Sequence, residues 1–473
     1  MTARPRPAPH RPAAVPTTLS VPDRSYPAAL AALEARGRFG IRLGLGRIRA
    51  ILRELGDPQL AVRGALVAGT NGKGSVLALV AAALREAGYR VGETPKPHLV
   101  TYRERLQVDG RPVDPATFAR LVSEVLPIAD RIAPRLGPAT EFELLTAVVF
   151  RWFAEAGLDL AVVEVGLGGR LDATHAWDGG VAVVTNVDLD HMDRLGSTIP
   201  AIAREKAAII ERGDRAVTGA TGEALDVVRR RARRLEVPLV VAPPAPLIGW
   251  DRDAVVVELP RLGETRIGLR GRHQAANAAV ADATLDALAA AGIATVSPDA
   301  RRRGYASARW PGRLELLSVP TPDGALEVLL DGAHNPAGAA ALATALDDLR
   351  PFLAGGRDAR PSPLTLLVAV MADKDVDGIV AALSRAVALD RARIICTRPA
   401  GGRALPASAL ANRWSAIAPG TTVTAVDDVD EALDRALTAA PGPIVVAGSL
   451  YLVGAVRARL IDDPALVDPE GAA

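Results

Sequence analysis

The sequence predicts an α/β protein made of two domains, each built on a mostly parallel sheet. Short β-branched runs alternate with longer helical patterns along almost the whole chain, which is typical of βαβ units. The alternation is interrupted at residues 293–313 by Pro, Gly and an arginine run, and such stretches often mark a domain boundary. A length of 473 residues also exceeds the ~100 to 200 residues of an ordinary domain. We therefore expect a tail over residues 1–22, a first domain over 23–297 and a smaller second domain over 298–473.

Strand candidates of the first domain are short apolar runs separated by helical patterns: "GALVAG" (64–69), "DLAVVEV" (159–165), "VAVVTNV" (181–187), "RAVTGA" (215–220) and "PLVVA" (238–242). "DAVVVELP" and "TRIGLRG" are spaced as a hairpin around "RLGE", ahead of a helical pattern at 273–292. In the second domain, "ALEVLLDG", "LTLLVAV", "ARIICT", "TVTAV" and "PIVVAG" alternate with helical stretches. This pattern predicts a Rossmann-like, doubly wound domain.

Composition and charge exclude several functional classes. A hydrophobic fraction of 49% and a charged fraction of 23% are those of a globular protein. The net charge of +2 gives no sign of a general nucleic-acid binder. A single cysteine, Cys396, excludes an internal disulfide and fits a reducing compartment. No apolar run approaches the ~20 residues of a membrane span. The Pro- and Arg-rich N-terminus has no apolar run long enough for a signal peptide, so we expect none. We expect a cytoplasmic protein without nucleic-acid or membrane partners.

A glycine-rich turn follows the first strand candidate, in "LVAGTNGKGSVLALVAAAL". Its glycines allow close backbone approach, and the N–H groups at the start of the following helix attract anions. Lys73 would lie on the β- and γ-phosphates and Ser75 on Mg²⁺. The spacing differs from the common G-x-x-x-x-G-K-[ST] pattern, because Gly74 separates the lysine from the hydroxyl. We expect a P-loop ATPase-like first domain that binds ATP through Gly69, Thr70, Asn71, Gly72, Lys73, Gly74 and Ser75.

The string "GTNGKGS" resembles the phosphate loop of the folylpolyglutamate synthase and dihydrofolate synthase family, ATP-dependent ligases related to the muramyl peptide ligases. Further strings match this family in its own order: "EVGLGGRLDAT", "LDH", "EKA", "GRHQAANAA", "WPGR", "DGAHNP", "DKD" and "AGSLYLVG". The resemblance implies a bifunctional enzyme that ligates L-glutamate to 7,8-dihydropteroate or to the γ-carboxylate of (tetrahydro)folate glutamates. ATP and Mg²⁺ would activate the carboxylate as an acyl phosphate, and such a site must offer cations and metal ligands.

The resemblance also implies which residues hold metal ions beside Ser75. Glu143, at the start of a helical pattern, corresponds to a Mg²⁺ ligand. His191 corresponds to the histidine of a second metal, and it follows an apolar strand, where sites of α/β proteins collect. Lys206 lies among apolar residues, and desolvation favours its neutral amine. In the related ligases this lysine takes up CO₂ and becomes a carbamate; the alternative is a lysine that extends to solvent.

The remaining nucleotide contacts are expected from both domains. Gln274 and Asn277 lie at i and i+3 of one helical face, and their amides suit an adenine edge. By resemblance, Arg313 contacts the ATP phosphates, Asp331 holds the ribose and His334 lies near the transferred phosphate. The predicted catalytic residues are Lys73, His191, Lys206 and His334.

The expected substrate residues are Lys96, His98, Glu164, Asp172, Asp373 and Lys374. Glu164 and Asp172 belong to a second glycine-rich turn and are candidates to orient the pteridine, whereas Asp373 and Lys374 are expected on the glutamate-binding side. At Lys96 the family has a serine whose hydroxyl approaches the first Mg²⁺, and an ammonium group has no lone pair for a metal. Either Lys96 supplies positive charge to the phosphate or a substrate carboxylate, or it points away and water fills the site.

Three other functions fit parts of the sequence. A ligase for another acid, such as a muramyl peptide ligase, shares the phosphate loop and the lysine carbamate. A P-loop switch or motor would release ADP without glutamate, so glutamate-dependent ADP release separates it from a ligase. A non-catalytic relative would bind its ligands only. We expect a monomer, and we expect the basic run at 229–234 to be the solvated face of a helix.

Overall fold

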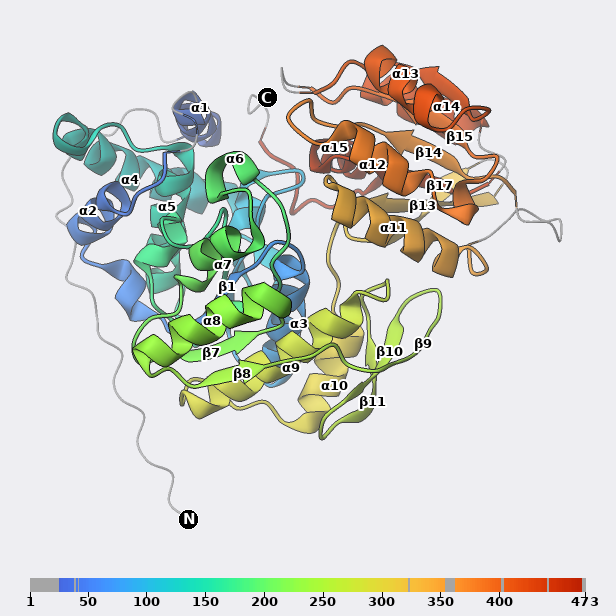
Figure 1. Ribbon diagram of the computed structural model, residues 1–473. Coiled ribbons are helices and arrows are strands. Elements are labelled where there is room, and N and C mark those ends of the chain that lie inside the picture. The colour runs from blue at the N-terminus through green and yellow to red at the C-terminus, as the bar shows by residue number, and fades with distance from the viewer. Residues whose placement is uncertain are drawn as a thin grey trace.

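The chain folds into two α/β bodies that lie beside each other in Figure 1. The computed structural model describes residues 25–37, 40, 42–321, 324–353, 362–400, 404–439 and 442–469, so the predicted tail over 1–22 lies outside the described residues. An eight-stranded and a three-stranded sheet belong to the first body, and a six-stranded sheet belongs to the second. This architecture confirms the predicted α/β fold class.

The large sheet of the first domain has the strand order β4-β3-β2-β5-β1-β6-β7-β8. From β2 to β8 neighbouring strands are parallel, and β3 and β4 add an antiparallel edge. Strands β1 and β5 are buried along their whole length, as expected of a parallel sheet covered on both faces. The strands span Gly64–Ala68 (β1), Val91–Thr94 (β2), Gln107–Val108 (β3), Arg111–Pro112 (β4), Leu160–Glu164 (β5), Gly180–Val184 (β6), Arg215–Thr218 (β7) and Leu239–Val241 (β8).

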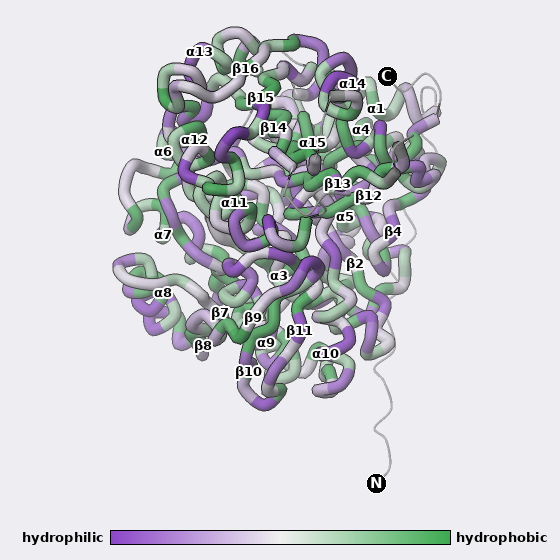
Figure 2. Tube along the Cα trace, turned by 90° about the vertical axis from the view of Figure 1, so that its right-hand side faces the viewer, coloured by the Kyte–Doolittle hydropathy of each residue, from purple (hydrophilic) through white to green (hydrophobic). Residues whose placement is uncertain are grey.

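Helices cover both faces of this sheet, because successive residues of a strand point to opposite faces. Along β1, Leu66 and Ala68 belong to one apolar core, whereas Ala65 and Val67 belong to another. The first core includes α1 (Tyr26–Gly37), α2 (Gly46–Glu54), α4 (Pro115–Leu136), α5 (Glu141–Glu155), α7 (Ile199–Ala207) and α8 (Gly222–Leu235). The second includes α3 (Lys73–Glu86), α9 (Gln274–Ala290) and α10 (Pro298–Ser307). In Figure 2, α8 lies at the periphery with hydrophilic residues, and four arginines of the run 229–234 are exposed, as predicted.

A three-stranded antiparallel sheet in the order β11-β10-β9 packs into the second core. Strand β10 (Val255–Leu259) pairs with β11 (Gly263–Ile267), which confirms the predicted hairpin, and β9 (Leu247–Trp250) pairs with the other edge of β10. The short helices of this domain are η1 (Pro58–Ala61), η2 (Tyr102–Arg105), η3 (Ala173–Ala176) and α6 (Met192–Leu195).

The sheet of the second domain has the order β12-β13-β17-β14-β15-β16, parallel except for β12. Its strands span Glu315–Thr321 (β12), Gly324–Asp331 (β13), Thr365–Val368 (β14), Arg393–Cys396 (β15), Thr422–Ala425 (β16) and Ile444–Ala447 (β17). One face is covered by α11 (Pro336–Leu349), α12 (Val376–Leu383), η4 (Val387–Leu389) and α13 (Ala407–Ile417). The other face is covered by α14 (Val429–Ala439) and α15 (Leu450–Leu460). The helices on both faces make this a doubly wound domain.

Helix α10 packs with the first domain. Ala300 and Tyr305 belong to its second core, and Gly304 lies so close to α3 that an added Cβ would come 2.4 Å from Ala83 Cα. The expected boundary at residue 298 precedes this helix. We therefore propose a boundary between α10 and β12.

The C-terminal segment returns to the first domain after α15. Asp468 accepts hydrogen bonds from Arg103 Nε (3.0 Å) and from the Thr101 hydroxyl (2.8 Å). Arg103 is buried, and its Nη2 also donates to the Val467 carbonyl (2.9 Å). The segment thus fastens the second domain to the loop that follows β2.

Candidate active site

The glycine-rich turn between β1 and α3 forms an anion cradle. Gly69 and Gly72 have φ values of 154° and 81°, which glycine adopts easily and other residues do not. A Cβ at Gly69 would come 1.9 Å from Thr185 Oγ1, and one at Gly72 would come 2.2 Å from Asn277 Oδ1. Helix α3 begins at Lys73, so its first N–H groups and the positive end of its dipole face the turn. The turn therefore has the form of a phosphate-binding loop.

Residues that follow β6 hold this loop in place. The Asn186 side chain accepts a hydrogen bond from Asn71 N–H (2.8 Å), and its carbonyl accepts one from Thr70 N–H (3.0 Å). The Thr185 hydroxyl donates to the Asn71 carbonyl (2.6 Å), and the Thr70 hydroxyl bonds to the backbone of Asp188. The sequence analysis did not single out Thr185, although its position at the end of a predicted strand could have indicated a place in the site. These contacts fix the loop in the absence of a ligand.

Gln274 and Asn277 lie against the loop together with Ser75. Gln274 Nε2 donates to Ser75 Oγ (3.4 Å), and Asn277 Nδ2 donates to Gln274 Oε1 (2.8 Å). All three side chains are buried. Trp310 covers Gly74, where a Cβ would come 2.4 Å from the indole ring; the sequence analysis quoted the stretch that contains this tryptophan without assigning it. The two amides support the loop, and their contact with adenine stays a prediction.

All four lysines of the chain lie around this site. The sequence has 56 lysine and arginine residues, and only four of them are lysines: Lys73, Lys96, Lys206 and Lys374. Lys73 Nζ donates to the carbonyls of Gly69 and Thr70, at 3.2 Å each. Lys206 Nζ reaches Gly69 O from α7 (2.9 Å). Burial, followed by the charge of Lys73, lowers the pKa of Lys206 to about 7.

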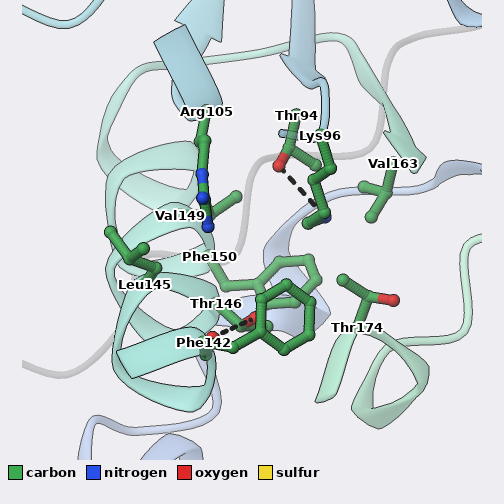
Figure 3. Close-up of a pocket in the computed structure, with 10 residues that line it drawn as sticks. All are labelled: Thr94, Lys96, Arg105, Phe142, Leu145, Thr146, Val149, Phe150, Val163 and Thr174. Atoms are coloured by element: carbon green, nitrogen blue, oxygen red, sulfur yellow. Dashed lines mark hydrogen bonds between the residues drawn. The ribbon is translucent and has the colours of Figure 1, made fainter. Parts of the chain in front are cut away.

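Glu164, the last residue of β5, lies between two of these lysines. Lys96 N–H donates to Glu164 Oε2 (2.9 Å), and Lys73 Nζ lies 3.9 Å from Glu164 Oε1. The Lys96 ammonium donates to the Glu164 carbonyl and to Thr94 Oγ1 (3.3 Å), as Figure 3 shows for the latter. Burial raises the pKa of Glu164, although both lysines oppose the shift. Burial also lowers the pKa of Lys96 to about 8. Of the two orientations considered for Lys96, the structure shows the inward one.

A small cavity lies between Lys96 and α5. Figure 3 shows Lys96 and Arg105 above the Phe142 ring, and the cavity of about 10 Å³ has room for about one water molecule. Arg105 Nε donates to His98 Nδ1 (2.9 Å), and the His98 and Tyr102 rings lie 4.3 Å apart. Burial and Arg105 lower the pKa of His98 to about 3. The expected substrate residue His98 is therefore a neutral imidazole held by Arg105, a residue that the sequence analysis missed.

Both carboxylate oxygens of Glu143 are already engaged by neighbouring residues. Its Oε2 accepts hydrogen bonds from Thr140 N–H (2.9 Å) and the Thr140 hydroxyl (3.0 Å), which caps α5. Arg47 Nε donates to both carboxylate oxygens at 3.0 Å, and Glu143 is only 2% exposed. The expected role of Glu143 as a Mg²⁺ ligand conflicts with this geometry, because a helix cap and an ion pair already engage both oxygens.

Asp172 shapes the second glycine-rich turn. Its carboxylate accepts hydrogen bonds from Leu167 N–H (2.8 Å), from Thr174 N–H (3.0 Å) and from the Thr174 hydroxyl. The residue is buried and caps η3. Its contact with a substrate stays a prediction.

The two domains meet at Asp190, in the loop after β6. Lys374 Nζ lies 3.9 Å from Asp190 Oδ1, and Asn335 Nδ2 donates to Asp190 Oδ2 (3.5 Å). His191 Nε2 lies 3.9 Å from the same Oδ2, and its side chain is 40% exposed. Burial lowers the pKa of His191, and Asp190 opposes the shift. The structure thus brings His191 and Lys374 together across the interface, whereas Asp373 is exposed beside them.

The second domain adds Arg313, Asp331 and His334. Asp331 ends β13 and accepts hydrogen bonds from Leu314 N–H and Ala333 N–H, at 2.9 Å each. His334 Nδ1 lies 2.8 Å from the Gly332 carbonyl. Burial and Arg313 lower the pKa of His334 to about 4. The contact of Asp331 with a ribose stays a prediction.

The described residues contain neither a cluster of metal-ligating side chains nor a helix that could span a membrane. Among them, no cluster of three or more His, Cys, Asp and Glu side chains has the arrangement of a metal site. Within the same ranges, none of the helices combines the length and the apolar character needed to cross a bilayer.

Two family models match this chain. Residues 67–243 match the Mur ligase middle domain, and residues 314–460 match the C-terminal domain of dihydrofolate synthetase. The chain is 33% identical over 452 residues to the dihydrofolate synthase/folylpolyglutamate synthase of Bacillus subtilis, covering 92% of this chain and 99% of that protein. It is 36% identical to the Mycobacterium tuberculosis protein of the same name, over 89% of this chain and 90% of that one.

Solved structures agree with the sequence matches. The folylpolyglutamate synthase of Mycobacterium tuberculosis complexed with ADP and AMPPCP superposes with a TM-score of 0.80 at 34% identity, covering 93% of this chain and 100% of that one. E. coli FolC in complex with DHPP and ADP gives a TM-score of 0.76 at 32% identity, covering 92% and 97%. The similarity therefore extends over both domains.

Proposed function

The chain belongs to the dihydrofolate synthase/folylpolyglutamate synthase family, and we propose on this basis that it ligates L-glutamate to 7,8-dihydropteroate, to folate glutamates or to both. The observation that carries the proposal is the similarity along nearly the whole chain to enzymes of that name. In the reaction, a carboxylate oxygen of the acceptor attacks the γ-phosphorus of ATP and ADP leaves. The glutamate amine then attacks the acyl carbon of the acyl phosphate, loses a proton and expels phosphate.

The glycine-rich turn supplies the ATP phosphate site in this proposal. Lys73 donates to two loop carbonyls in the structure, and its flexible stem lets it turn to the phosphates when ATP binds. From the second domain, the His334 Nδ1–H donates to the Gly332 carbonyl, which leaves Nε2 of the neutral ring as an acceptor. Arg313 adds a permanent positive charge near His334 and Asp331.

Mg²⁺ fits the loop at Ser75. Ser75 is buried two residues after Lys73, and its hydroxyl accepts only a long hydrogen bond from Gln274 Nε2, at 3.4 Å. The hydroxyl oxygen therefore remains available as a ligand of the kind that Mg²⁺ prefers. Bound with ATP, Mg²⁺ would neutralise phosphate charge. We propose Ser75, His191 and Lys206 as its protein ligands, and not Glu143.

Lys206 would serve as a ligand after carbamylation. Its amine is buried beside the loop, and a pKa of about 7 leaves much of it unprotonated at neutral pH. The neutral amine attacks CO₂, a nitrogen–carbon bond forms, and one proton passes to solvent. The product is an anionic oxygen ligand in place of a cation.

Asp190 is proposed to hold the two halves of the site together while the acyl phosphate exists. It contacts Lys374 and Asn335 of the second domain, and both follow strands of that sheet. Closing the interface at this point would keep water from the acyl phosphate. We propose that Lys374 and Asp373 receive the carboxylate and ammonium groups of glutamate.

One incubation tests the proposal. The purified protein is mixed with ATP, Mg²⁺, L-glutamate and either 7,8-dihydropteroate or tetrahydrofolate, and the products are identified by mass. We expect a glutamyl amide with at least one acceptor and ADP release that depends on glutamate. ADP release without glutamate would indicate an ATPase, and the absence of an amide with both acceptors would contradict the proposal.

Two expectations accompany this proposal. The enzyme is expected to be monomeric, which light scattering after gel filtration checks. It is expected in the cytoplasm, which cell fractionation of the source organism checks.

A further inference from the structure

Lys96 is a lysine in a chain that otherwise uses arginine. Only four of the 56 basic residues are lysines, and Lys96 is one of them. An ammonium group is a compact point charge, whereas guanidinium is a broad planar fork. At Lys96 the loop therefore places beside Glu164 a basic group that resembles a small cation in size.

Lys96 contacts Glu164 with both its backbone and its side chain. Its N–H donates to Glu164 Oε2 (2.9 Å), and its ammonium donates to the Glu164 carbonyl and to Thr94 Oγ1 (3.3 Å). The ammonium also lies 5.5 Å from the centre of the Phe142 ring, a distance of cation–π contact. Backbone and side chain together fix the ammonium beside Glu164, and Figure 3 shows its hydrogen bond to Thr94.

Glu164 already has its positive charges without a metal. Oε2 accepts the backbone N–H of Lys96, and Oε1 lies 3.9 Å from the Lys73 ammonium. The Lys96 ammonium donates to the main-chain carbonyl of Glu164, and its charge, like that of Lys73, favours the ionised carboxylate. A divalent ion on the same carboxylate would lie a few ångströms from both ammonium groups, and like charges repel strongly where water is excluded. When Lys73 turns to the phosphates, Lys96 still compensates Glu164. The residues around Glu164 therefore do not fit a divalent cation.

We propose that Lys96 is a positioning residue that replaces a divalent cation at Glu164, so that the working enzyme carries Mg²⁺ at the Ser75 side of the nucleotide and none on Glu164. The inference rests on the proposed ATP-dependent function. In this proposal, the ammonium group of Lys96 takes the place of one metal ion on the substrate side of the site.

Counting bound Mn²⁺ tests this proposal. Mn²⁺ replaces Mg²⁺, AMPPCP replaces ATP, and free Mn²⁺ is followed by electron paramagnetic resonance as it titrates the full-length protein. Lys96→Ser removes the ammonium and adds a hydroxyl, so we expect it to bind one more Mn²⁺ per chain than the wild type. Lys96→Arg keeps the charge and should keep the wild-type count. In the Lys96→Ser background, Glu164→Gln should remove the additional ion.

Two results would overturn the proposal: an equal Mn²⁺ count in Lys96→Ser and wild type, or a lower count when Glu164→Gln is made in the wild type. The second comparison does not need the serine variant to fold. Neither count requires glutamate or a pterin, so a failure of the ligase assay is distinguishable from a failure here. As a second readout, Lys96→Ser should need several-fold more Mg²⁺ for half-maximal activity, whereas Lys96→Arg should not.

Discussion

Replacing Glu143 by glutamine should destabilise the protein and leave its Mg²⁺ dependence unchanged. The carboxylate caps α5 through Thr140 and pairs with Arg47. Glutamine keeps one oxygen for the cap but turns an NH₂ group toward Arg47 Nε, so the guanidinium loses its partner. Removing one member of a buried ion pair costs about 3–5 kcal/mol. Arg47 keeps a 13% exposed side chain and a bond to the Arg42 carbonyl, so we expect about 2–4 kcal/mol.

Urea unfolding and thermal denaturation measure this loss. Each kcal/mol lowers Tm by about 2–4 °C in a domain of this size, which gives a fall of roughly 5–15 °C. Ligase activity, titrated with Mg²⁺ well below the transition, should stay within about twofold of the wild type, because only a lost metal ligand would change it more. The matched control Thr140→Ala removes the cap hydroxyl but no charge and should cost about 1 kcal/mol. An unchanged Tm with a raised Mg²⁺ requirement would refute the reasoning.

Three further predictions concern other parts of the molecule. Burial and the neighbouring Asp178 carboxylate raise the pKa of Asp214 to about 8. Between about pH 4 and 8 the folded state therefore binds more protons than the unfolded state, and its stability falls as the pH rises through that window. Asp214→Asn should raise the free energy of unfolding by on the order of 1–2 kcal/mol at pH 9 and change it little at pH 4, and an equal change in Tm at both pH values would contradict this. In ¹³C NMR spectra recorded with ¹³CO₂, the wild type should show a carbamate carbon signal that is absent from Lys206→Ala. The turnover of Lys206→Ala should fall roughly 10–100-fold, and intact turnover would disprove the role of Lys206 as a metal ligand. Asp468→Ala leaves Nε of the buried Arg103 without an acceptor and its charge without a carboxylate partner, which should cost about 1–3 kcal/mol in urea unfolding. No measurable loss would show that the C-terminal segment is not fastened in solution.

The alternation of strands and helices was predictable because parallel strands covered on both faces are continuous apolar runs. Strand β1 is an example, with its five residues buried. Helix α10 was less predictable, since Pro298–Ser307 carries three consecutive arginines and weak periodicity. Its membership of the first core depends on Gly304, which permits close contact with α3, and such contact between distant segments leaves no local pattern.

The site was predictable where one short segment carries the chemistry. The loop at Gly69–Ser75 combines a strand end, glycines and a lysine in one string, and the structure keeps that string as an anion cradle. The carboxylates were harder to assign. Thr140 and Glu143 have the spacing of a capping box, which is a local signal against a free carboxylate. The neighbours of the Glu164 carboxylate, Lys73 and Lys96, come from two separate segments and meet it only once the sheet is assembled.

The location of all four lysines around the phosphate loop and the loops that face it gives the enzyme an unusual amine chemistry. Apart from the α-amino group, every primary amine of the chain lies beside the phosphate loop or the loops that face it. The pKa values of Lys206 and Lys96, about 7 and about 8, make these two amines far more nucleophilic at neutral pH than an ordinary lysine. Acyl donors such as reactive thioesters or anhydrides therefore meet an arginine-covered surface that they cannot modify, and their attack is confined to the site. In this protein, acylation of any lysine falls on the site itself, and bound nucleotide should protect against it.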